Sequence, residues 1–535
     1  MKNKILKLSL MATLLLSLSS CRLLFNISNE NTNTSNNHSL EYKFTESDKT
    51  AINNRITELN TLISNGNYYQ KFYNAYIRVV KGDLYSVATY RNLAQLNYSI
   101  LADSTSREKY SEANEYLNTL VEWEESLYKK IYNSKFRDEF FKNYTKEEID
   151  SLVGTSLPKE YYDLENENDK LLVQYDAISD PTTSSEVPVL YRKLVENYKL
   201  QASYYGYTDY RDFAYKELYD RDFDSDNALQ FSNYVREYIV PLFENKTNSF
   251  NNKYQNASSK YKTTVSSFIA GSYKNYMDYF DEYAKEIGGS YYLAYNNLWN
   301  NGYYFMGKSS SSDGAYTLYL YNLSTPACYF GPNYQNISTL VHEFGHYYSM
   351  LERGNGSGSL DLAETQSQGN ELLFLAYLDS NNKFLPETLA MIRDYKLSEA
   401  LQTIVLANLV NDFENTIYST DNLSLIDFDN LFINVCDKYG GYYYLKEIFG
   451  GDFSTYWRRV ALDNPLYYIS YSVSLIPAIG LYQAGMKDFN SASDSYNKIV
   501  FYDYQNMSFL DVLDAAGLYN PFVENSFKEL SKLYE

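Results

Sequence analysis

Histidine and cysteine are the scarcest functional residue types in this sequence, with three of each in 535 residues. So few cysteines cannot build a disulfide framework, so stability must come from a large hydrophobic core. Two of them, Cys328 and Cys436, either pair outside the cell or remain buried thiols. Basic residues are also in deficit, with 47 against 67 acidic residues and a formal charge of −20. Such a charge repels nucleic acid and anionic lipid, which excludes nucleic acid as a partner.

Long apolar runs are absent after the first twenty residues. The chain begins with a stretch holding three lysines, an apolar run from Ile5 to Leu18, and the letters LSSC ending at Cys21. The run is too short to span a bilayer comfortably, and a cysteine directly after small residues resembles a bacterial lipoprotein signal. We therefore expect a signal peptide over 1–20 and an extracytoplasmic protein anchored to the cell membrane by lipid on Cys21. The alternative is an ordinary secretory signal or a weak transmembrane anchor.

The rest of the chain divides by composition and periodicity. Residues 21–44 are polar and lack periodicity, which predicts a disordered tether. Apolar residues three and four apart indicate helices over 45–195, interpreted as an N-terminal helical lobe, with a loop at 179–189. Residues 196–535 are predicted to form a catalytic domain that is also mainly α-helical. Within it, Gly314 to Phe330 is rich in β-favouring residues, which predicts a hairpin or a pair of strands.

The stretch LVHEFGHYYSM contains two of the three histidines, His342 and His346, with Glu343 between them. On a helix this spacing places both imidazoles on one face, where both can bind one metal ion. Glu343 projects beside them and can take a proton from a metal-bound water. In a chain with three histidines and 67 acidic residues, chance produces the pattern roughly 0.002 times. The motif predicts a zinc peptidase with one zinc ion per chain, although cobalt or manganese suits the same ligands.

A catalytic zinc needs a third protein ligand, and two glutamates are candidates. On a continuous helix Glu352 would point away from His346. Glu364 is the better choice, because it follows a glycine-rich break at 353–359 that lets a second helix fold back. Glu371, seven residues later, shares the helix face of Glu364 and either orients a ligand histidine or is an ordinary helix carboxylate.

Four segments, in this order, resemble the thimet oligopeptidase and oligoendopeptidase F family of zinc peptidases. They are YYGYTDYRDFAYKEL, SSDGAYTLYLYNLSTPACYF, HEFGH followed by AETQSQGNE, and YWRRVALDNPLYYISYSVS. The resemblance covers roughly residues 200 to 535. It implies a mainly α, two-lobed fold with a deep substrate channel and a small β element beside the zinc site. It also implies that His342, His346 and Glu364 bind zinc and that Glu343 is the general base.

The last segment departs from the family pattern. The family usually carries a histidine four residues before the proline equivalent to Pro465, and here that place is Ala461. The family's tyrosines, which donate hydrogen bonds to the tetrahedral intermediate, correspond best to Tyr467 and Tyr471, with Tyr468 as a third candidate. The missing histidine affects the expected efficiency and substrate preference, but it leaves zinc binding and the general base intact.

The sequence thus predicts a zinc metalloendopeptidase that hydrolyses short peptides outside the cytoplasmic membrane. Two alternatives belong to other classes of protein. One is a catalytically impaired peptide-binding lipoprotein that retains the metal site, and the other is a tyrosine-rich surface adhesin. Peptide cleavage that a chelator abolishes separates the first prediction from both alternatives.

Overall fold

The computed structural model describes residues 44–534, apart from 155–156, 177, 179, 355–358, 463 and 504–505. The predicted signal peptide, Cys21 as the predicted site of lipidation and nearly all of the predicted tether lie outside the described residues. The described chain is mainly helical with one small sheet, which confirms the predicted fold class. Among the helices of the described ranges, none is long and apolar enough to cross a membrane.

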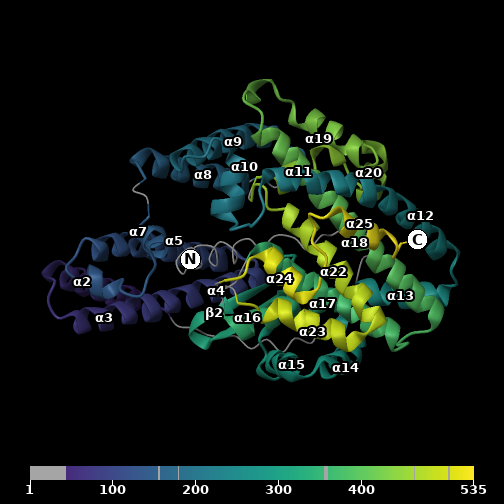
Figure 1. Cartoon of the computed structure of the whole chain (residues 1–535), viewed down its shortest axis with the longest axis horizontal. Coiled ribbons are helices and arrows are strands. Elements are labelled where there is room, and N and C mark those ends of the chain that lie inside the picture. The colour runs from purple at the N-terminus through teal and green to yellow at the C-terminus, as the bar shows by residue number, and fades with distance from the viewer. Residues whose placement is uncertain are drawn as a thin grey trace.

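The N-terminal helices lie at one end of the long axis of the molecule (Figure 1). They are α2 (Glu46–Asn65), α3 (Tyr69–Ile77), α4 (Leu84–Leu101), α5 (Ser104–Tyr132), α6 (Arg137–Phe140) and α7 (Lys146–Val153), with a π-helical turn at Arg78–Asp83. Local signals fix their ends: α2 begins with a capping box between Thr45 and Asp48 and ends at Gly66, whose φ is 62°. Aromatic side chains dominate the core between these helices, as in the stacked pair Phe72 and Phe136.

A second run of helices leads to the sheet. It comprises α8 (Lys159–Asp176), α9 (Val187–Tyr204), α10 (Tyr210–Phe213), α11 (Ser225–Tyr234), α12 (Val240–Asn256), α13 (Ser259–Ala270), α14 (Met277–Ile287) and α15 (Gly289–Asn301), with π-helical turns at Ala214–Leu218 and Val235–Ile239 and a 3₁₀ turn at Tyr273–Tyr276. The predicted loop at 179–189 ends earlier, because α9 already begins at Val187 and accepts a proline in its first turn. Side chains of α8 and α9 belong to the large core of the molecule. The predicted boundary at residue 195 stays a prediction.

The sheet has three strands in the order β1-β3-β2. Strand β2 (Ala315–Leu320) and β3 (Thr325–Phe330) pair antiparallel, around a 3₁₀ turn at Tyr321–Leu323, and confirm the predicted hairpin. A third strand, β1 (Tyr304–Met306), pairs parallel to β3 and was not expected, because three residues carry no periodic pattern. Alternate side chains of β2 point to opposite faces: Tyr316 and Leu318 pack with α4, and Thr317 reaches Glu343.

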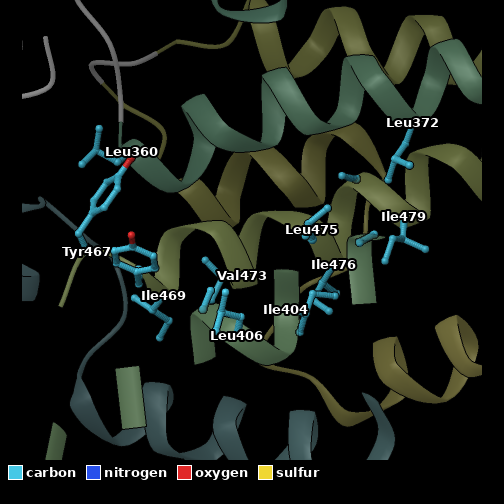
Figure 2. Packing of buried hydrophobic residues seen from close by; sticks show 14 of the residues in the cluster. Leu360, Leu372, Ile404, Leu406, Tyr467, Ile469, Val473, Leu475, Ile476 and Ile479 are labelled. Carbon is cyan, nitrogen blue, oxygen red and sulfur yellow. The ribbon is translucent and has the colours of Figure 1, made fainter. Parts of the chain in front are cut away.

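Three helices form the centre of the large core: α16 (Ile337–Arg353), α17 (Leu360–Ser380) and α18 (Pro386–Tyr418). The break predicted at 353–359 separates the first two. A fourth helix, α22 (Ile469–Lys487), is buried on nearly all sides. Figure 2 shows its apolar side chains, among them Val473 and Ile476, beside Ile404 and Leu406 of α18. A helix that is apolar all round belongs inside a large protein, so α22 fixes the position of its neighbours.

Shorter elements complete the fold around this centre. They are α19 (Phe428–Cys436), α20 (Tyr442–Phe449), α21 (Trp457–Val460), α23 (Phe489–Val500), α24 (Phe509–Ala516) and α25 (Glu524–Ser531), with 3₁₀ turns at Leu423–Leu425, Asp437–Tyr439 and Phe453–Thr455. Cys328 and Cys436 are buried free thiols, so of the two predicted alternatives the structure supports the unpaired one.

Candidate metal centre

The two motif histidines lie one turn apart on α16. Asn336 caps this helix by accepting a hydrogen bond from the backbone of Thr339 at 2.9 Å. The ring centroids of His342 and His346 are 5.1 Å apart. The side chain of His342 is 17% exposed, whereas His346 is 3% exposed. The helix therefore presents one imidazole at the edge of the core and one inside it.

A glycine lets α17 cross α16 closely enough to bring the third candidate ligand to the histidines. A Cβ atom on Gly345 would lie 2.7 Å from Cα of Ser367 and 2.9 Å from the carbonyl oxygen of Gln366. Any other residue would therefore push the two helices apart. At this crossing one ligand atom each from His342, His346 and Glu364 lies within 4.8 Å of the others.

Glu364 joins the histidines and Glu352 does not. His342 Nε2 lies 3.8 Å from Oε2 of Glu364. Glu352 sits on the exposed side of α16, one residue before the helix ends, and is outside the only such group found among the described residues. The geometry therefore favours Glu364 as the third ligand, the choice preferred from the sequence.

The chemistry of these donors fits a divalent transition metal such as zinc. Two imidazoles and one carboxylate form a usual three-ligand set for a catalytic zinc, which leaves a position for water or substrate. Burial lowers the pKa of His346 well below its usual value, and the nearby His342 adds to the shift. His346 is thus neutral, which is the form of imidazole that binds a metal.

A charged chain supports His342 from behind. Nδ1 of His342 lies 2.7 Å from Oε1 of Glu371, and Oε2 of Glu371 lies 2.9 Å from Nζ of Lys396 on α18. Burial alone would raise the pKa of Glu371, but Lys396 and His342 hold it at about 2. Burial alone would lower the pKa of His342, but Glu371 and the surrounding carboxylates raise it to about 9. With Nδ1 engaged by Glu371, Nε2 is the nitrogen left for a metal.

Glu343, the candidate general base, is 3% exposed and lies against the sheet. Thr317 of β2 donates a hydrogen bond from Oγ1 to Oε2 of Glu343 at 2.8 Å. Burial raises the pKa of Glu343 to about 7, while the positive charge of His342 and the bond from Thr317 act against that rise. No pattern in the sequence points to Thr317, because it lies 26 residues from Glu343 on another element.

The two predicted tyrosine donors lie next to Glu364. The hydroxyl of Tyr467 is 3.3 Å from Oε1 of Glu364 and 3.3 Å from the hydroxyl of Tyr471. Tyr467 is 2% exposed, whereas Tyr471 is half-buried. Burial raises the pKa of both phenols well above its usual value, so both hydroxyls keep their protons. Tyr468, the third candidate, packs its ring against the other two, and Ala461 is buried in the core.

No protein-family model matches the sequence, and no curated protein matches it. Solved structures do resemble the fold. Pz peptidase A, solved with an inhibitor, has a TM-score of 0.70 and 14% identity over 93% of this chain and 99% of its own. A protein assigned as oligoendopeptidase F from Bacillus anthracis str. Ames has a TM-score of 0.68 and 16% identity over 94% of this chain and 98% of its own.

A more distant likeness is to the M32 carboxypeptidase from Deinococcus radiodurans R1. Its TM-score is 0.55 and its identity is 12%, over 91% of this chain and 100% of its own. At such identities the likeness concerns the fold. The chain therefore has the fold of these peptidases over nearly its whole length, and the candidate metal group lies within that fold.

Proposed function

We propose that this chain is a zinc-dependent metalloendopeptidase that hydrolyses short oligopeptides. The observation that carries the proposal is the meeting of His342, His346 and Glu364 around one point, with the buried Glu343 on the same helix. A fold shared with structures described as peptidases supports it.

The three ligands would come from two helices. His342 would bind through Nε2, because Nδ1 is engaged by Glu371, and His346 and Glu364 would complete the set. Zinc, when bound, supplies Lewis acidity and lowers the pKa of a water molecule to about 7. The proton transfers and the hydrogen bonds to the intermediate would come from side chains of this chain.

Glu343 would act as the general base and later as the general acid. Its carboxylate accepts the proton of the attacking water and passes that proton to the leaving amine. Thr317 holds one carboxylate oxygen by its hydrogen bond at 2.8 Å, which leaves the other oxygen for the proton. A pKa of about 7 suits a group that must take up and release a proton near neutral pH.

Tyr471 and Tyr467 would donate hydrogen bonds to the oxyanion of the tetrahedral intermediate. Both phenols keep their protons, which a donor requires. Tyr471 is the more exposed of the two, and Tyr467 also contacts Glu364. We therefore assign the larger share of this stabilisation to Tyr471.

The alternative function is a peptide-binding lipoprotein with impaired catalysis. One specific observation favours it: the buried Ala461 stands where the resembling family usually has a histidine. Turnover separates the two functions. Incubation of the purified protein with a mixed peptide pool, followed by mass spectrometry, should show internal cleavage of short peptides that a chelator abolishes. Binding without new fragments would support the alternative.

Two variants test the assigned roles. Glu343→Gln should keep zinc and lose about 10³-fold in hydrolysis, because an amide cannot accept the water's proton. Glu364→Ala should weaken zinc binding, with Glu352→Ala as the matched control on the exposed side of α16. If Glu352→Ala loses zinc and Glu364→Ala does not, the ligand set is wrong.

The location is also a proposal: a protein held at the outer face of the cytoplasmic membrane by lipid on Cys21. The support is the apolar run and the LSSC letters at the start of the chain. Cys21→Ser should convert a membrane-associated protein into an unprocessed precursor or a released form. Equal partitioning of both proteins into detergent would contradict lipidation.

A further inference from the structure

The turn that carries Tyr467 has a strained backbone. We call residues 465–470, which lead into α22, the tyrosine turn. Leu466 within it has a φ of 64° and is fully buried. A leucine in the left-handed region is unfavourable, because its Cβ atom crowds the following carbonyl, and this conformation persists only where the surroundings over-determine it. The contacts around this turn should therefore show what holds it.

Three buried side chains from distant parts of the chain hold the tyrosine turn. The backbone amide of Leu466 donates to Oε1 of Glu414 at 3.0 Å, and its carbonyl accepts from Nη1 of Arg221 at 2.9 Å. The hydroxyl of Tyr219 donates to the carbonyl of Pro465 at 2.7 Å. Both polar groups of the strained residue are thus bound by buried side chains, so the turn is fixed on both sides.

Arg221 makes the largest number of these contacts. Its Nη2 donates to Oγ of Ser470 at 2.8 Å and lies 3.4 Å from the carbonyl oxygen of Tyr467. Its guanidinium also lies 4.8 Å and 4.5 Å from the ring centroids of Tyr215 and Tyr219. A planar, always charged fork enclosed by rings and carbonyls has no room for a second arrangement.

The other side of Arg221 faces the helix that carries Glu364. Nε of Arg221 lies 3.4 Å from Oδ2 of Asp361, and both side chains have no exposed surface. Asp361 is three residues before Glu364 on α17, so it lies one turn away on a neighbouring face. Arg221 therefore joins the first turn of α17 to the tyrosine turn.

The contacts close into a ring at Glu364. The hydroxyl of Tyr467 reaches Oε1 of Glu364 at 3.3 Å, and it comes from outside α17. The other hydroxyl beside this carboxylate, that of Ser367, lies closer to the carbonyl of Glu364, at 3.1 Å, than to Oε2, at 3.3 Å. Tyr467 is therefore the contact that orients the Glu364 carboxylate relative to the rest of the fold.

We propose that Arg221 is a positioning residue that fixes the hydroxyl of Tyr467 against Glu364 and thereby orients the third metal ligand. It rests on the proposed function in one respect, the assignment of Glu364 as a ligand. Partners that orient a metal ligand typically contribute 10- to 100-fold to metal affinity. Arg221 acts one contact further out, through the backbone carbonyl of Tyr467, and a lysine in its place would keep the positive charge that faces Asp361.

A double-mutant cycle measured as zinc affinity tests this route. Zinc dissociation constants are determined by chelator competition for the wild type, Arg221→Lys, Tyr467→Phe and the double variant. We expect Tyr467→Phe to weaken binding about tenfold and Arg221→Lys about fivefold, while the double variant binds as weakly as Tyr467→Phe alone. Lysine keeps the positive charge and loses the fork, so a change reports geometry. Additive losses would overturn the proposal.

Arg458 provides a matched control for a merely structural role. It too is buried, and it donates to the carbonyl of Ser184 at 2.8 Å and to Oδ2 of Asp429 at 2.6 Å, away from the metal group. Arg458→Lys should lower the melting temperature, as Arg221→Lys does, and leave zinc affinity within about twofold. Equal weakening of zinc binding by both variants would show a general loss of packing and overturn the proposal.

Ser470→Ala covers the case in which Arg221→Lys does not fold. It removes one acceptor of Arg221 and should weaken zinc binding about twofold, with no further loss in the Tyr467→Phe background. The same loss in both backgrounds would contradict the proposal. Peptide hydrolysis is assayed separately. If the wild type binds zinc without cleaving peptides, the proposed function is wrong and the inference about Arg221 is unaffected. Wild-type affinity in Glu364→Ala defeats the ligand assignment and this inference together.

Discussion

Two glutamates on long helices, Glu371 half-buried and Glu124 buried, show how differently two regions of the molecule are built. Glu371 on α17 has its pKa held at about 2 despite burial, because Lys396 and His342 face it. Glu124 on α5 has its pKa raised to about 7 by burial, against a single hydrogen bond from the hydroxyl of Tyr128 at 3.3 Å. Desolvation acts in the same direction at both sites, so the charged partners account for the difference.

The two regions differ in how they place charged side chains inside the core. The N-terminal helices bury aromatic rings, and no cation among the described residues lowers the pKa of their buried carboxyl, Glu124. The helices around the candidate metal group bury carboxylates together with lysine and arginine, as in Glu371 with Lys396 and Asp361 with Arg221. Buried charge is costly, so its concentration around one point indicates function more strongly than any single residue there.

The largest expected effect lies in the charged region. Tyr471→Phe should lower kcat and kcat/KM together by about 10²- to 10³-fold, because the lost hydroxyl would contact the substrate only as the intermediate forms. Phenylalanine keeps the ring packing, so the melting temperature should change little. Steady-state kinetics and thermal unfolding measured side by side test this. Turnover within about twofold of wild type would make Tyr471 a packing residue.

Glu371→Gln should weaken zinc binding by about 10- to 100-fold, the next largest effect. The amide still accepts the bond from His342, but it has no charge to raise the basicity of that ligand. Glu399→Gln is the matched control, because Glu399 also pairs with Lys396 and, among the described residues, does not contact the histidine. The zinc dissociation constants of both variants, measured by chelator competition, test this prediction. Similar losses in the two would mean that the pairing of Lys396, rather than the support of His342, sets the affinity.

The smallest effect on the metal site belongs to the N-terminal region, where the expected change is in stability and depends on pH. The pKa of Glu124 is about 7 in the folded protein and near 4.3 in the unfolded chain. Protonation of Glu124 therefore stabilises the fold, and this contribution is fully present below about pH 4.3 and lost as pH rises through 7. Glu124→Gln should therefore be more stable than wild type by about 1 kcal/mol at pH 5 and by about 3 to 4 kcal/mol at pH 8.

Thermal or denaturant unfolding at both pH values tests the Glu124 prediction. Glu122→Gln, two residues earlier on the exposed side of α5, is the control for the loss of a negative charge. A gain that is the same at pH 5 and pH 8, or that Glu122→Gln reproduces, would contradict a buried carboxyl without a counter-charge.

The sequence predicted the parts of the site that depend on local pattern. The spacing of His342 and His346, the break before α17 and the seven-residue step from Glu364 to Glu371 all follow helix geometry. The structure places Glu364 and Glu371 beside the histidines as that geometry requires. The helical class and the hairpin followed from periodicity in the same way.

The supporting contacts could not be predicted, because their partners are distant and carry no periodic signal. Thr317 lies 26 residues from Glu343, and Arg221 lies 245 residues from Leu466. Each is a common residue type in an ordinary stretch, and only the packing of helices and sheet gives it a partner. For the same reason the sequence assigned Tyr467 as a donor to substrate without revealing its contact with Glu364.

The close crossing at Gly345 has a thermodynamic consequence. With zinc held as proposed, an ion bridges two helices that already meet through packed surfaces and through hydrogen bonds, from Asn370 to the carbonyl of Val341 and between His342 and Glu371, so its binding free energy adds to their docking. The free energy of unfolding would then depend on the concentration of free zinc. Above the dissociation constant, each tenfold rise in free zinc adds about 1.4 kcal/mol to the stability of the folded chain.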